Sequence, residues 1–95
     1  MNIAIQAIKF SVADKLTAYI EKKVGKLDKF YNAITDAEVV LKVVKPETAE
    51  NKEVQITLLG SNVKLFASKQ ADSFEQAVSE CVIALEKQIK KLANK

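Results

Sequence analysis

The chain contains no histidine, no tryptophan and no arginine, and only one cysteine, one proline and two glycines among 95 residues. The lack of histidine removes the usual general base, and catalysis needs titratable groups of tuned pKa at fixed separation. A lone cysteine, Cys81, cannot form an internal disulfide or a CxxC site, and two glycines cannot build a loop that cradles phosphates. The carboxylates are scattered among lysines instead of being clustered as a divalent metal requires. We therefore expect no enzyme, no metal, no cofactor and no small-molecule substrate.

Long apolar stretches are missing as well. No apolar run approaches the roughly 20 residues needed to cross a bilayer, and the start of the chain lacks the basic and apolar regions of a secretory signal. We therefore expect a cytoplasmic protein without a membrane segment. An apolar share of 48% with 28% charged residues is typical of a folded protein. Since this length suffices for one small core, the prediction is a single domain over residues 1–95.

The first part of the chain predicts a strand followed by a helix. Residues 2–10 alternate apolar and polar side chains, which is the period of a half-buried strand. Residues 11–14 fit a capping box in which Ser11 and Asp14 start a helix. Apolar residues then recur at three- and four-residue steps as far as residues 30 and 31, and Gly25 weakens this helix without ending it.

Three further strands are expected at residues 37–45, 53–59 and 63–69. A loop over residues 46–51 holds the only proline, and Gly60-Ser61-Asn62 predicts a tight hairpin turn. The last helix starts at residues 72–76, where either Asp72 with Glu75 or Ser73 with Gln76 can form the cap. Its apolar stripe includes Cys81, for which we expect a role in core packing.

This order predicts an α+β fold, β-α-β-β-β-α, with a four-stranded mixed sheet. The first two strands flank a helix and should be parallel through a right-handed crossover, whereas the later strands should meander antiparallel. Both helices are expected to pack on one face of the sheet.

The basic residues are the most informative feature, because all fifteen are lysines in a chain of net charge +3. Lysines bind anions as point charges, without the bidentate geometry of arginine. One interpretation is an ordinary solvated helix face, partly offset by nearby carboxylates. The other is a basic groove for a phosphate backbone, formed where two neighbouring helices bring their lysine rows together. The candidate residues are Lys22, Lys23, Lys26, Lys29, Lys87, Lys90 and Lys91.

The open face of the sheet offers a second candidate surface. Phe66 is expected to point away from the helices, together with Val40, Val44 and Leu59. This surface could form a weak homodimer or bind another protein, or Phe66 could have no role. A sheet that stacks RNA bases would normally carry several aromatic residues on adjacent strands.

Three segments resemble the bacterial ribosome hibernation-promoting factor and ribosome-associated inhibitor (protein Y) family. They are AEVVLKVVK at residues 37–45, KKVGKLDKFYNAI at 22–34 and FEQAVSECVIALEKQIKKL at 74–92. The resemblance covers essentially the whole chain, in the short type that lacks the C-terminal dimerisation domain of long members. It implies the same order of elements and binding to the small ribosomal subunit near the decoding centre.

The implied mechanism is steric, since an occupied messenger and transfer RNA channel inhibits translation under stress or in stationary phase. By position, the resemblance implies contacts to ribosomal RNA for Lys23, Lys26, Lys87 and Lys91, whereas periodicity alone adds Lys22, Lys29 and Lys90. Many relatives are basic where this chain has Ala84, so we expect weaker and more salt-dependent binding. Two alternatives remain open: a protein-interaction module at the open sheet face, and a general binder of duplex RNA.

Overall fold

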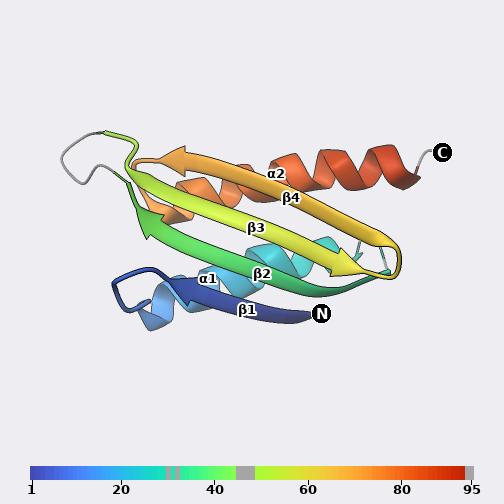
Figure 1. The fold of residues 1–95 in the computed structure, drawn as a ribbon, viewed down its shortest axis with the longest axis horizontal. Helices are drawn as coiled ribbons and strands as arrows, with labels where there is room; N and C mark the ends of the chain where they lie inside the picture. The colour runs from blue at the N-terminus through green and yellow to red at the C-terminus, as the bar shows by residue number, and fades with distance from the viewer. Residues whose placement is uncertain (30, 32, 45–48, 94–95) are drawn as a thin grey trace.

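One sheet and two helices account for nearly all of the regular structure. The computed structural model describes residues 1–29, 31, 33–44 and 49–93. Its elements are β1 (Asn2–Ala7), α1 (Asp14–Gly25), the 3-10 helix η1 (Lys26–Lys29), β2 (Ile34–Val43), β3 (Lys52–Gly60), β4 (Val63–Ala71) and α2 (Phe74–Ala93). Figure 1 shows them along the chain. Neither helix in this described part is long and apolar enough to cross a membrane.

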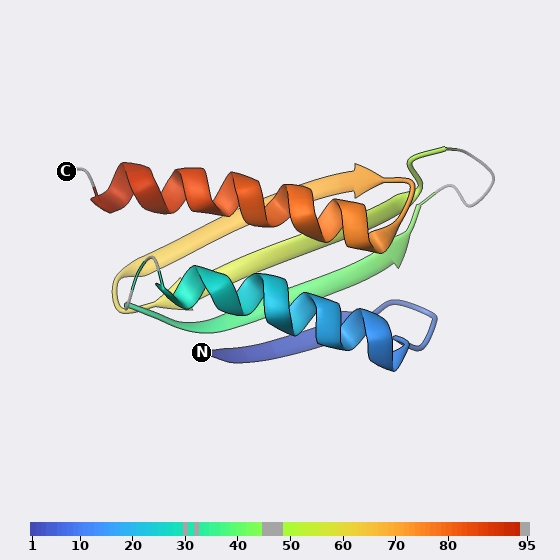
Figure 2. The same cartoon turned by 180° about the vertical axis from the view of Figure 1, so that it is seen from behind.

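The strands lie in the order β1-β2-β3-β4. β1 is parallel to β2, and the other neighbouring pairs are antiparallel. A parallel pair needs a crossover connection, which α1 and η1 supply. Both helices run along the same face of the sheet, side by side, as Figure 2 shows. The predicted α+β fold, with a four-stranded mixed sheet and two helices on one face, is confirmed.

The core lies between the sheet and the two helices. Alternate side chains of β3, those of Val54, Ile56 and Leu58, are completely buried. They belong to one cluster with the apolar stripes of both helices, represented by Val24 and Leu85. Burying one such side chain stabilises the fold by roughly 1.5–3 kcal/mol. These stripes fix which side of each helix faces the sheet, and so which lysines face outward.

The start of α1 differs from the prediction. Ala13 is the N-cap, its carbonyl accepts a hydrogen bond from the Thr17 N–H at 3.0 Å, and no side chain caps the helix. Ser11 precedes the N-cap by two positions, so the expected capping box over residues 11–14 is wrong. β1 also ends earlier, at Ala7, because Lys9 has a φ of 66°, which lies outside the strand region.

The first helix changes type along its length. It is α-helical to Gly25 and continues as the 3-10 turn η1, so the expected continuation of the α-helix through Gly25 is wrong. Glycine costs helical stability and is a natural point for such a change. The helical pattern was expected to reach residue 31, but Tyr31 is not helical. The predicted helix position at residue 30, the strand end at residue 45 and loop residues 46–48 lie outside the described residues.

The later elements follow the prediction with small shifts, and β2 ends at Val43, so Val44 lies outside the strand that was expected to include it. β2 already begins at Ile34, whose buried side chain adds to the core before a register shift in the ladder. β4 continues to Ala71, which is buried. The tight turn is the expected short loop, Ser61 and Asn62, with a φ of 59° at Asn62.

The structure also decides between the two caps proposed for α2. The Ser73 hydroxyl accepts a hydrogen bond from the Gln76 N–H at 3.1 Å, so Ser73 is the capping residue. The Asp72 carboxylate instead accepts the Glu50 N–H at 2.7 Å. Asp72 therefore ties the segment before β3 to the start of α2.

Candidate nucleic-acid interface

The predicted lysines protrude from α1, η1 and α2, opposite the buried stripe of each helix. Six are exposed, whereas Lys23 is partly buried with its ammonium 5.6 Å from the centroid of the Tyr19 ring. Within the described part of the chain, ion pairs join only Lys42 to Glu53 and the Met1 amino group to Asp28. The candidate ammonium groups are therefore available to bind external anions. The six exposed lysines are Lys22, Lys26, Lys29, Lys87, Lys90 and Lys91.

The 3-10 turn η1 aligns two of these lysines. Residues three apart are eclipsed in a 3-10 helix, whereas in an α-helix they are offset around the axis. Lys26 and Lys29 are the two ends of η1, and Leu27 between them is completely buried. Their ammonium groups consequently project from the same side of the chain.

The three candidate lysines of α2 share the outer side of that helix. Lys87, Lys90 and Lys91 lie within about 100° of one another around the axis, and all three are exposed. Gln88 lies on the flank that faces β4, because its side chain donates a hydrogen bond to the Phe66 carbonyl oxygen at 2.9 Å.

Figure 2 shows how α1, α2 and β4 are arranged. α1 runs beside α2, and β4 crosses behind α2, so that β4 is on the far side of α2 from α1 near the start of that helix and on the α1 side near its end. The expected basic groove between the two lysine rows stays a prediction.

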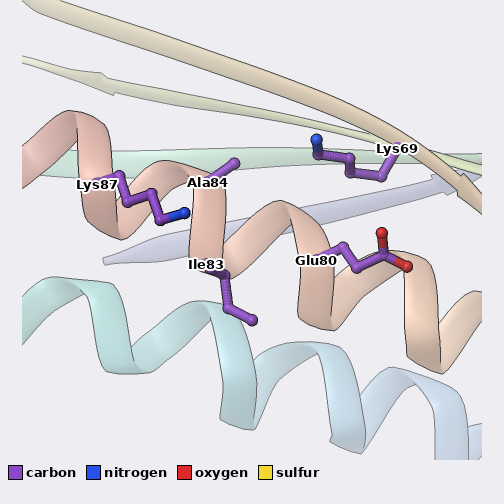
Figure 3. Close-up of a pocket in the computed structure, with 5 residues that line it drawn as sticks. All are labelled: Lys69, Glu80, Ile83, Ala84 and Lys87. Carbon is purple, nitrogen blue, oxygen red and sulfur yellow. The ribbon is translucent and has the colours of Figure 1, made fainter.

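A shallow hollow of about 380 Å³ opens between α2 and β4. Figure 3 shows the side chains of Lys69 and Lys87 extending toward one another over Ala84, whereas the Glu80 carboxylate points away from Lys87. Lys69 is the residue that the sequence-based prediction missed. It occupies an inward position of β4, in step with Ala67 and Ala71, yet it is exposed. A lysine at an inward strand position is the signal that could have identified it.

The opposite face of the sheet has a different character. Phe66 is exposed there by 51% of its surface, as expected. The alternation of the strands places Asp36, Glu38 and Glu53 on this face, and Glu53 pairs with Lys42 at 3.3 Å. Carboxylates repel a phosphate backbone, so the helical face suits nucleic acid better.

Cys81 offers no chemistry at neutral pH. Its side chain is completely buried, and its sulfur lies 3.3 Å from the Val54 carbonyl oxygen. Burial raises the pKa of the Cys81 thiol to about 12, so the reactive thiolate is scarcely populated. The predicted role in core packing is confirmed. The described residues contain no group of three or more side chains that could hold a metal ion.

Comparison with known proteins identifies the family. Residues 3–95 match the family described as Sigma 54 modulation protein / S30EA ribosomal protein. The Ribosome hibernation promotion factor of Lactococcus lactis subsp. cremoris (strain MG1363) is 32% identical over 80 residues, which cover 84% of this chain and 43% of that protein. The Ribosome hibernation promotion factor of Staphylococcus aureus (strain COL) is 28% identical over 91 residues, covering 96% and 47%. The chain thus spans about half the length of these curated relatives.

Solved structures share the fold. The crystal structure of the Thermus thermophilus Protein Y N-terminal domain superposes with a TM-score of 0.82 at 22% identity, covering 97% of this chain and 99% of that one. A ribosomal subunit interface protein from Coxiella burnetii gives a TM-score of 0.88 at 19% identity, with complete coverage of both chains. At these identities the similarity establishes the arrangement of the elements.

Proposed function

The chain belongs to the Sigma 54 modulation protein / S30EA ribosomal protein family, and on that basis we propose that it is a ribosome hibernation factor that binds the small ribosomal subunit. Its curated relatives are named for ribosome hibernation promotion. In this proposal residues 1–95 act as one binding unit in the cytoplasm. The protein works by occupying a site and not by catalysis, and it needs no cofactor.

The single observation that carries the proposal is the distribution of charge over the two faces of the molecule. The helical face presents exposed lysines without ion-pair partners among the described residues, whereas the outer sheet face has three carboxylates, those of Asp36, Glu38 and Glu53, against the two lysines Lys42 and Lys64. A phosphate backbone is therefore attracted to the first face more strongly than to the second. RNA is therefore bound by the sides of α1, η1 and α2 and not by stacking on the sheet, where Phe66 is the exposed aromatic residue.

The proposed mechanism is steric exclusion. We place the protein near the decoding centre, with its lysines against the phosphates of ribosomal RNA and its body across the path of messenger and transfer RNA. Lysine contacts of this kind depend on where the ammonium groups lie and on their charge. The fold therefore contributes by holding the two helices in fixed positions. The continuous core between sheet and helices provides that rigidity.

Co-sedimentation with purified small ribosomal subunits tests this function. We expect the protein to pellet with the subunit at about 50 mM salt and to lose roughly 1,000-fold in affinity by about 200 mM, the change typical of six or more phosphate contacts. An excess of unrelated duplex RNA should compete poorly, since a general duplex binder would accept any A-form helix. Failure to pellet at low salt would exclude ribosome binding, and efficient competition would favour the general binder.

The open sheet face is tested by Phe66→Thr. Threonine keeps strand propensity and removes the exposed ring, so we expect the free energy of unfolding to change by less than about 1 kcal/mol. Subunit binding should stay within twofold of the parent protein, and light scattering should give the same mass. A variant that loses a partner or a dimer, while the lysine variants keep it, would make this face the interaction surface.

A further inference from the structure

The hollow between α2 and β4 adjoins the surface predicted from the helices, and it is lined by two lysines together with Glu80, Ile83 and Ala84. Lys69 enters it from β4 and Lys87 from α2, with the small side chain of Ala84 between them (Figure 3). Neither lysine takes part in an ion pair with any described residue. Two like charges directed at one space repel each other unless an anion lies between them.

We propose that this hollow holds a phosphate of the ribosomal RNA backbone between Lys69 and Lys87, which makes Lys69 an RNA-binding residue contributed by the sheet. This inference rests on the proposed function and extends its contact surface beyond the helices. A volume of about 380 Å³ is at the lower end of the range for ligand sites and is open on one side. It suits one small charged group on a longer chain better than an enclosed small molecule.

The neighbouring lysine explains why the ligand is a nucleic-acid strand. Lys91 lies one helical turn from Lys87 on the same flank of α2, a rise of about 6 Å along the axis. Lys91, Lys87 and Lys69 therefore line one path along the edge between α2 and β4. A strand that follows this path meets several ammonium groups in succession, as a phosphate backbone requires.

The rest of the hollow is compatible with this ligand. The Glu80 carboxylate is directed away from Lys87, so the space over Ala84 is flanked by positive charge (Figure 3). The Gln88 hydrogen bond to the Phe66 carbonyl oxygen holds α2 on β4, the two elements from which Lys87 and Lys69 extend.

The test is small-subunit binding by Lys69→Ala, with Lys64→Ala as the matched control. Lys64 is also an exposed lysine of β4, but it lies at an alternate position that faces the other side of the sheet. We expect Lys69→Ala to weaken binding about tenfold at low salt and to lower the salt slope by about 1, the contribution of one phosphate. Lys64→Ala should bind like the parent protein.

The double variant Lys69→Ala/Lys87→Ala tests whether the two lysines share one phosphate. If they do, the salt slope falls by about 1 and not by about 2, and the combined loss is smaller than the product of the single losses. Additive losses would mean two separate contacts and would overturn the shared site.

The outcomes distinguish this inference from the proposed function. If the parent protein does not bind small subunits, the proposed function fails and the inference with it. If the parent protein binds and Lys69→Ala binds equally well, or Lys64→Ala is equally impaired, only the phosphate site at the hollow is overturned. Circular dichroism of each variant verifies that the fold is retained.

Discussion

Co-sedimentation with the small ribosomal subunit is expected to be lost when four lysines are replaced together by glutamate: Lys23, Lys26, Lys87 and Lys91. Four phosphate contacts contribute a slope of about 3 to 4 log units of affinity per log unit of salt. Between about 50 and 200 mM salt this amounts to roughly 100-fold. Charge reversal replaces each attraction by a repulsion, so we expect a loss of at least about 100-fold at low salt. Sedimentation at two salt concentrations measures both the loss and the flatter slope.

Pairwise variants make this experiment specific to the surface. Lys23→Glu/Lys26→Glu alters the α1 and η1 side, and Lys87→Glu/Lys91→Glu alters the outer side of α2. The control, Lys9→Glu/Lys64→Glu, makes the same change in net charge at exposed positions outside the helices. Each helix pair should weaken binding strongly, and the control pair only slightly. Equal weakening by all three pairs would mean that net charge, and not the helical surface, determines binding.

Gly60→Ala is expected to have the largest effect on stability of any single methyl addition at a glycine. A β-carbon at Gly60 would overlap the Ala33 carbonyl oxygen, and it would lie 2.7 Å from the Ala33 carbonyl carbon and 2.9 Å from Cγ1 of Val63. The same carbonyl accepts the Ser61 N–H at 3.2 Å, so moving it away also weakens the hairpin. Overpacking of this kind costs about 1–3 kcal/mol. Each kcal/mol lowers the Tm of a domain this small by about 4–8 °C.

The matched control for this experiment is Gly25→Ala, which should change stability in the opposite direction. A β-carbon at Gly25 meets nothing within 4 Å, and the residue is the last of α1. Alanine in a helix is more stable than glycine by about 0.5–1 kcal/mol. Thermal unfolding of both variants measures the difference. A stable Gly60→Ala protein would mean that the Ala33 main chain moves at little cost.

The fold could be predicted from the sequence because its main determinants are periodic. The alternation around Val54, Ile56 and Leu58 and the helical stripe around Leu85 specify which faces are buried, and the structure has them buried. The ends of α1 were less predictable. Ser11 and Asp14 have the right spacing for a cap, but the turn at Lys9 and the path of the chain into the core decide where the helix begins.

The candidate site could be predicted only in part. Helical periodicity identifies exposed lysines one helix at a time, and that part needs no tertiary information. The relation between elements does need it, because Lys69 of β4 and Lys87 of α2 line the same hollow, which no local pattern reveals. For the same reason Lys69 was not among the predicted residues, although its side chain is exposed.

The bond from Gln88 to the Phe66 carbonyl also bears on how the molecule avoids self-assembly. β4 is an edge strand of the sheet, and unpaired carbonyl groups on an edge strand are templates for pairing with a second chain. Gln88 occupies one of these groups in the middle of β4. An incoming strand would have to displace it and pass the overlying α2. Gln88, which holds α2 on β4, thus also blocks a site at which a second chain could pair with the sheet.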